Sequence, residues 1–114
     1  MRGVWRMAVL GVAVAACVLA APAVAGPYSN VAAAMVRAAA PSMEAYRYDH
    51  GTYVGVTLAK LRVYDRNTSS VEIAYAHKDT YCLQANVLGS WYHIARTGPA
   101  ANAVVGSATH CPSG

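Results

Sequence analysis

The chain has 114 residues, and its nine lysines and arginines against five aspartates and glutamates give a formal net charge of +4. This length permits one small domain and excludes a multidomain enzyme. Apolar residues make up 56% of the chain and charged residues 12%. That composition excludes intrinsic disorder, which needs low hydrophobicity and high charge.

The first 25 residues have the layout of a secretory signal peptide. Two arginines precede a long uncharged run, and the run ends in an A-x-A pattern of small residues at Ala25. This order of basic start, apolar stretch and small-residue cleavage site is typical of exported proteins. We therefore expect cleavage between Ala25 and Gly26, which leaves residues 26–114 as a secreted, extracytoplasmic domain.

Two other interpretations of the N-terminus stay open. The stretch from Met7 to Ala25 spans 19 residues and could just cross a bilayer as a retained helix. Its alanine-rich composition and Pro22 favour a signal peptide instead. Small residues before Cys17 also resemble the approach to a lipidated cysteine, although the residues after Cys17 are apolar where a lipoprotein has a polar tether.

Removing residues 1–25 leaves 89 residues with a net charge of +2. The remaining cations are scattered, which excludes the clustered basic surface of a nucleic-acid or anionic-membrane binder. We therefore expect no nucleic-acid partner and no membrane association after cleavage. Two cysteines remain, Cys82 and Cys111, and in an exported chain such a pair predicts one disulfide bond.

A helix is predicted over residues 29–49, where alanines are frequent. Ser29 or Asn30 can serve as its N-cap, and Gly51 supplies a stop. Pro41 removes one backbone hydrogen bond and is expected to kink the helix or to break it into two. One apolar face recurs every three or four residues, and it consists of Val36, Ala39, Met43 and Tyr46.

Residues 50–67 form a connector between the helix and the C-terminal half of the chain. It begins with a turn and continues with a short helix over residues 57–64. Thr57 can cap this helix, and Leu58 and Leu61 share one of its faces. The polar residues after it are typical of a loop.

Beyond Ser70 the hydrophobic period changes from helical to alternating, which predicts strands at about 70–77, 80–88 and 91–96. Gly89 and Ser90 are expected to form a two-residue hairpin turn. Such short connections require antiparallel neighbours. Two apolar sets should define strand faces, one in the first strand (Val71, Ile73, Tyr75) and one in the second (Tyr81, Leu83, Ala85, Val87).

The last segment, residues 98–114, has a weak structural pattern of its own. A bond from Cys111 to Cys82 would pin it across the second strand. The predicted fold class is therefore α+β, with an N-terminal helix packed on a three- to four-stranded antiparallel meander and a C-terminal loop tethered by the disulfide.

Two short motifs stand near the predicted helix exit. Glu44 and Tyr46 lie in a Glu-Ala-Tyr segment, and Asp49, Gly51 and Tyr53 form an Asp-x-Gly-x-Tyr pattern shortly after it. These motifs resemble the region after the N-terminal helix in type IV pilins and type II secretion pseudopilins. The cysteine pair is similar to the pair that delimits the C-terminal loop of many pilins. The resemblance implies a pilin-like domain with a structural or interaction role. Its implied partners are proteins of a type IV pilus or type II secretion filament, or further copies through exposed edges.

The N-terminus departs from the prepilin pattern. Gly3 is present, but Val4 comes directly after it, and Ala8 occupies the place of the glutamate that pilins use in assembly. The leading hypothesis is therefore a pilin globular domain exported as a soluble protein. Two alternatives remain: a divergent pilin subunit that retains its apolar helix, and a secreted ligand-binding module that uses an aromatic strand face.

No pattern of catalytic or metal-binding residues appears in the sequence. The histidines lack zinc-site spacing, and there is no nucleophile elbow or glycine-rich phosphate loop. The carboxylates are expected on the helix surface, in turns and in loops, and His77 and His93 on the solvent side of the sheet. We expect no enzyme activity, no cofactor and no metal site. The histidines are His50, His77, His93 and His110.

The chain has eight tyrosines and no phenylalanine. Tyrosines could form an aromatic binding platform. In a chain without phenylalanine they can instead fill the core while their hydroxyl groups remain at its rim. We favour the second interpretation.

Overall fold

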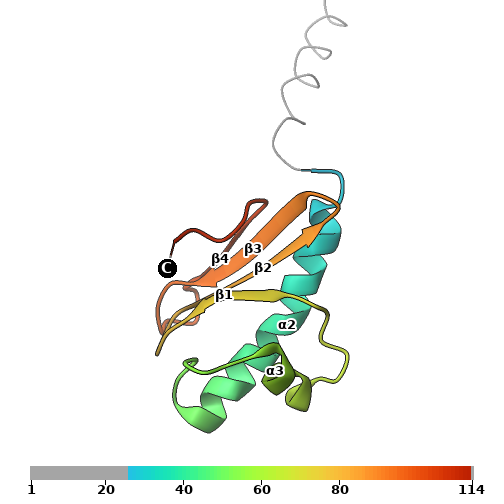
Figure 1. Ribbon diagram of the computed structural model, residues 1–114. Coiled ribbons are helices and arrows are strands. Elements are labelled where there is room, and N and C mark those ends of the chain that lie inside the picture. The colour runs from blue at the N-terminus through green and yellow to red at the C-terminus, as the bar shows by residue number, and fades with distance from the viewer. Residues whose placement is uncertain (1–25, 114) are drawn as a thin grey trace, which may run out of the picture.

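A computed structural model describes residues 26–113. A long helix packs on one face of a four-stranded antiparallel sheet, whose strands follow the chain in the order β1-β2-β3-β4 (Figure 1). The elements are α2 (Ser29–His50), α3 (Leu58–Tyr64), β1 (Glu72–Ala76), β2 (Tyr81–Val87), β3 (Ser90–Arg96) and β4 (Val104–Ser107). The predictions of cleavage after Ala25, lipidation at Cys17 and a retained apolar helix lie outside the described residues.

α2 is one helix of 22 residues that passes through Pro41 without a break. The alternative prediction that Pro41 breaks the helix into two is therefore wrong. Pro41 is exposed, while Ala39 and Met43 on either side of it are fully buried against the sheet. Packing of these flanking turns outweighs the loss of a single backbone hydrogen bond. The predicted apolar face is confirmed, since all of its members are buried (Val36, Ala39, Met43 and Tyr46).

α2 begins at Ser29, as predicted, but its N-cap differs from the prediction. The N-cap is Tyr28, which makes no side-chain capping bond, and Ser29 is already helical and buried. The backbone N–H of Tyr28 donates to Ser90 Oγ at 3.1 Å. A contact with the sheet, 62 positions away in sequence, thus takes the place of the side-chain cap expected from Ser29 or Asn30.

The end of α2 is as predicted. Gly51 adopts a left-handed conformation with φ of 73°, and its N–H donates to the carbonyl of Arg47 at 2.7 Å. This conformation strains any residue with a Cβ atom.

We expect Gly51→Ala to lower the free energy of unfolding by about 1 kcal/mol, because alanine is strained in the left-handed region. A Cβ atom there would meet no atom within 4 Å, so the cost would be purely conformational. Gly98→Ala is the matched control, since Gly98 also has open space around it and no positive φ. Urea titration measures both variants, and equal changes would contradict this explanation.

The connector also follows its predicted course. The N–H of Lys60 donates to Thr57 Oγ1 at 3.2 Å, which caps α3. Leu61 is fully buried and Leu58 packs partly against the same core. α3 therefore covers the end of α2 that the sheet leaves open (Figure 1).

β1 departs from simple alternation. Its pairing with β2 shifts between Ile73 and Tyr75, so that Ile73 lies opposite Leu83 but Tyr75 lies opposite Cys82. Because of this irregularity, the side chains of β1 on either side of it follow a different alternation, and Tyr75 lies on the opposite face of the sheet from Ile73. Ile73 packs on the core beneath α2, whereas Tyr75 packs on the other face beside the disulfide. The prediction that Ile73 and Tyr75 share a face is wrong.

The hairpin turn between β2 and β3 lies one residue earlier than predicted. Leu88 and Gly89 form it, with φ of 51° and 86°, and Ser90 already pairs with Val87. Two consecutive positive φ values are the mark of a type I′ turn. Asn86 Oδ1 accepts from the N–H of Gly89 at 2.8 Å and stabilises the bend.

Residues 26–113 contain four strands, the upper end of the predicted range. β4 comes from the segment that showed only a weak pattern, and it pairs with β3 from Arg96 opposite Val104 to His93 opposite Ser107. The fold class is thus an α+β arrangement of a helix on an antiparallel meander.

The C-terminal tail lies against the sheet face that α2 does not cover. Cys82 and Cys111 form the predicted disulfide, with their Cα atoms 6.1 Å apart. The N–H of Cys111 donates to Gln84 Oε1 at 2.7 Å, and His93 Nδ1 lies 2.8 Å from the carbonyl oxygen of Thr109, to which it donates. His93 is therefore buried under the tail, and its predicted solvent exposure is wrong.

Candidate functional site

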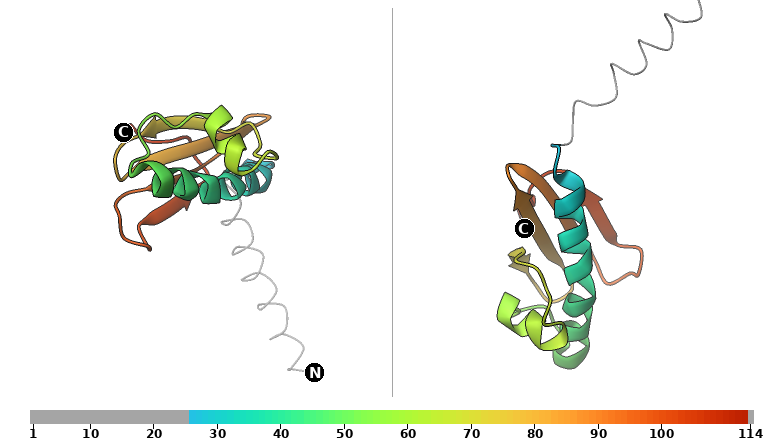
Figure 2. Two further views of the ribbon diagram at one scale, coloured as in Figure 1. Left: turned by 90° about the horizontal axis from the view of Figure 1, so that it is seen from below. Right: turned by 90° about the vertical axis from the view of Figure 1, so that its right-hand side faces the viewer.

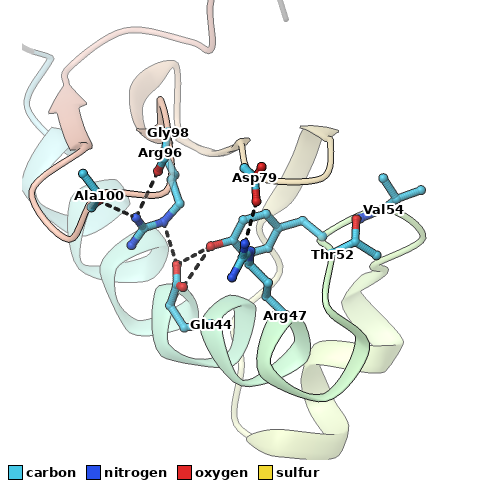
Figure 3. A network of polar contacts seen from close by, with 9 residues as sticks. Glu44, Arg47, Thr52, Val54, Asp79, Arg96, Gly98 and Ala100 are labelled. Carbon is cyan, nitrogen blue, oxygen red and sulfur yellow. Dashed lines mark hydrogen bonds and ion pairs between the residues drawn. The ribbon is translucent and has the colours of Figure 1, made fainter.

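Segments far apart in the sequence meet at a network of polar contacts centred on Glu44 and Tyr53 (Figure 3). The Tyr53 hydroxyl donates to both carboxylate oxygens of Glu44, at 2.8 and 2.9 Å. Arg96 Nε donates to Glu44 Oε1 at 2.9 Å. We call this set the Glu44–Tyr53 network. It connects α2, the connector and the end of β3.

Arg96 extends the network into the loop before β4. Its Nη1 donates to the carbonyl oxygens of Gly98 and Ala100, at 3.2 and 2.9 Å (Figure 3). The side chain of Arg96 is 12% exposed, against 43% for Glu44. The guanidinium of Arg96 is therefore mostly buried and donates both to the carboxylate of Glu44 and to backbone carbonyls of the loop. The carboxylate of Glu44 lies at the surface.

The ring of Tyr53 is enclosed on two sides. Arg47 places its guanidinium 5.6 Å from the ring centroid and pairs with Asp79 in the turn between β1 and β2. Tyr81 meets the ring edge-on with centroids 4.9 Å apart. The backbone N–H of Tyr53 donates to the carbonyl of His77 at 3.2 Å. Tyr53 is consequently one of the most deeply buried large side chains, with 1% of its surface exposed.

This environment raises the pKa values of two tyrosines. Burial of Tyr53 raises its pKa above the ordinary 10.0, and the hydrogen bond to Glu44 and the charge of that carboxylate raise it further. Burial, followed by the charge of Glu44, raises the pKa of Tyr81 to about 12. The positive charge of Arg96 opposes both shifts without cancelling them.

These shifts predict alkaline destabilisation. Above pH 10 the tyrosines of the unfolded chain lose protons while Tyr53 and Tyr81 keep theirs in the folded state, so the unfolded state gains stability as pH rises. The free energy of unfolding should therefore fall as pH rises from 10 toward the folded pKa values. Tyr53→Phe should flatten this fall, and Tyr48→Phe, at a side chain 91% exposed, should not. Chemical denaturation at pH 9, 10 and 11 measures the slope, and identical slopes would contradict the prediction.

The network acts as a structural brace. Both oxygens of Glu44 accept a hydrogen bond from the hydroxyl of Tyr53, and one of them also accepts from Arg96. The carboxylate thus ties α2 to the connector and to the end of β3. The arrangement can hold the connector and the β3–β4 loop onto α2.

The other residues of the helix-exit pattern also connect α2 to the connector. The Tyr46 hydroxyl donates to the carbonyl of Val54 at 3.1 Å, and the Tyr64 hydroxyl donates to Asp49 Oδ2 at 2.6 Å. Gly51 provides the left-handed exit already described. The pattern thus encodes the junction between α2 and α3.

Three residues of the site were missed in the sequence: Arg47, Asp79 and Arg96. Arg96 did carry a signal. It follows Ile94 by two positions in the strand and therefore lies on the same face, which α2 covers. An arginine on a covered face needs a buried partner. Asp79 carried none, since its partner lies 32 positions away in sequence.

Titratable side chains elsewhere are dispersed. Among residues 26–113 no three His, Cys, Asp or Glu side chains lie close enough together to hold a metal ion. Within the same range no helix has both the length and the hydropathy needed to cross a membrane. Three tyrosines fill the core, as expected in a chain without phenylalanine, and these are Tyr46, Tyr53 and Tyr81.

We compared the chain with protein-family models, curated proteins and solved structures. Nothing in any of the three sets matches it.

Proposed function

We propose that the chain is a secreted, non-enzymatic, pilin-like domain with a structural or interaction role, accessory to a type IV pilus or a type II secretion filament. Its partners in this proposal are proteins of that pilus or secretion system. The domain would consist of residues 26–114 after removal of residues 1–25.

One observation carries the proposal. The residues of the pilin-like pattern, Glu44 to Tyr53, all serve the junction between a long helix and an antiparallel meander whose C-terminal segment is held by a disulfide. A helix on a meander with a disulfide-delimited C-terminal segment is what the resemblance implies. The disulfide is also consistent with an extracytoplasmic location.

Loss of the apolar N-terminus would favour an accessory role over that of a core subunit. Pilus cores are held together by apolar N-terminal helices, and cleavage after Ala25 would remove that segment. The apolar face of the helix that remains, α2, is buried on its own sheet, with Val36, Ala39 and Met43 fully enclosed. Ala8 also stands where the assembly glutamate is expected. A domain of this kind would associate through its exposed edges and loops.

Intact mass and N-terminal sequencing of the protein from its native host test the proposal. We expect a start at Gly26 and recovery from the extracytoplasmic fraction. A start at Val4 would replace the proposal with a divergent pilin subunit, and a diacylated Cys17 would replace it with an anchored lipoprotein.

A second measurement tests the role itself. Deleting the gene should change the number or length of pili, or the activity of the secretion filament, and electron microscopy of the purified protein at high concentration should show no filaments. Unchanged pili and secretion would contradict an accessory role. Ordered filaments with helices bundled at their axis would contradict the soluble form.

A further inference from the structure

β4 forms an open edge of the sheet within the described residues, because it is last in the strand order. The N–H of Thr97 donates to the carbonyl of Ala103 at 2.8 Å. Antiparallel ladders alternate, and the register of β3 with β4 therefore directs the backbone groups of Val105 toward β3. Val104 and Gly106 direct their N–H and C=O groups outward.

A groove of about 290 Å³ runs between this edge and α2. Figure 2 shows β4 beside one flank of α2, with β1 toward the opposite flank. Val104 and Val105 are 38% and 53% exposed. The groove is lined by Arg37 and Ala40 of α2, Tyr92 and Ile94 of β3, and Val104 and Gly106 of β4.

Arg37 is held in position at this groove. Its Nη2 donates to the Tyr92 hydroxyl at 2.9 Å, and its guanidinium lies 5.1 Å from the centroid of the same ring. A Cβ atom at position 106 would lie 2.6 Å from that hydroxyl, so Gly106 leaves the space that the ring occupies. The ion pairs among residues 26–113 join Arg47 to Asp79 and Arg96 to Glu44. Arg37 takes part in neither.

The two edges of the sheet differ. β1 is interrupted by its irregularity between Ile73 and Tyr75 and exposes Glu72, both of which discourage the addition of another strand. β4 has neither a bulge nor a charged or proline residue among its four residues. An unprotected edge of this kind is a template for strand addition.

We propose that β4 and the groove bind an extended segment of another protein that carries an acidic side chain. The outward groups of Val104 and Gly106 would pair with the backbone of the segment. Side chains alternate along a strand, so every second residue would face the flank of α2, where a carboxylate can receive two hydrogen bonds from the guanidinium of Arg37. The inference does not depend on the pilin-like assignment.

Charge favours a foreign partner over a second copy of the chain. Residues 98–107, which contain β4 and the loop before it, have no aspartate or glutamate. If β4 paired with β4 of a second copy, the two Arg37 side chains would both lie at the paired edges. Neither would find a carboxylate there. An acidic strand provides the complementary charge.

Nuclear magnetic resonance with a defined probe tests the proposal. The full chain, expressed in an exporting host and labelled with ¹⁵N, is titrated with a capped seven-residue peptide of alternating threonine and valine that has one central aspartate. A second peptide has asparagine in place of the aspartate. We expect shifts at the amides of Val104 and Gly106 and at Arg37 Nε. We also expect about tenfold tighter binding of the aspartate peptide, since hydrogen bonds between ionised groups are the stronger ones.

Two variants separate the backbone contribution from the charge. Arg37→Gln should abolish the preference for aspartate while the weaker binding remains, and Arg66→Gln is its control because Arg66 is an exposed loop cation. Val104→Pro should weaken the binding of both peptides, because proline lacks the outward N–H and leaves the bonds to β3 intact. Val104→Thr, which keeps the N–H, is the matched control.

Several results would overturn the proposal. They are the absence of shifts with millimolar peptide, shifts confined to other elements, equal affinity for the two peptides, and a β4-mediated dimer from which peptide is excluded. The last result would assign the edge to a second copy of the chain.

Discussion

Replacing both Cys82 and Cys111 with alanine should lower the free energy of unfolding by about 3–4 kcal/mol. The bond closes a separation of 29 residues, and the entropy that such a loop loses in the unfolded chain accounts for this amount. Because a small domain shifts its Tm by about 4–8 °C per kcal/mol, the Tm should fall by more than about 12 °C. Thermal unfolding followed by circular dichroism measures the change.

When the disulfide is removed, the loss of structure should begin in the C-terminal tail. Cys111 donates its N–H to Gln84, and the loop around it makes few apolar contacts apart from a small cluster with Cys82 and Ala95. Hydrogen exchange at the Cys111 amide should accelerate before exchange in β2 and β3 does. Reducing agent should reproduce the effect in the wild type and have none on the double variant. Non-reducing peptide mapping that finds both thiols free would contradict the prediction at its first step.

Glu44→Ala should lower the free energy of unfolding by about 1–3 kcal/mol, the usual cost of leaving a buried donor without its acceptor. The buried donor is the Tyr53 hydroxyl, and Arg96 loses its ion-pair partner in the same change. Glu72→Ala is the matched control, because Glu72 is an exposed carboxylate on the edge strand β1. Urea titration compares the two variants.

A double-mutant cycle assigns the effect to the network. Tyr53→Phe removes the donor without removing the ring, so the combined variant Glu44→Ala/Tyr53→Phe should be less destabilised than the sum of the two single changes. Strict additivity would show that Glu44 and Tyr53 do not act together. A loss with Glu72→Ala as large as that with Glu44→Ala would contradict the assignment to the network.

Local patterns in the sequence were enough to predict α2, α3 and the first three strands. The apolar spacing of Val36, Ala39 and Met43 indicated the buried face of α2, and Gly51 marked its end, because helix periodicity and a left-handed exit depend on neighbouring residues only. Thr57 and Leu61 placed α3 for the same reason. The change of period near Ser70 predicted an antiparallel sheet, and the pair Cys82 and Cys111 predicted the disulfide bond.

Predictions failed where a distant contact competed with a local preference. The N-cap of α2 is Tyr28, whose N–H donates to Ser90 of the sheet, and packing carried the helix through Pro41. A shift in register against β2 placed Tyr75 beside the disulfide. No clear pattern marked β4 in the sequence, because an edge strand of four residues forms only by pairing with its neighbour β3.

The candidate sites also contain some contacts that the sequence could predict and others that it could not. The pattern from Glu44 to Tyr53 pointed to the helix exit, because those residues are close in sequence. The tertiary structure alone brought Arg96 to Glu44 across 52 positions and Arg37 to Tyr92 across 55. Hydrogen bonds of this kind form only after the sheet has folded onto α2. Sequence by itself therefore determined the two helices and the first three strands. The tertiary structure decided that β4 forms and which charged side chains meet, since both depend on a strand register that no local pattern specifies.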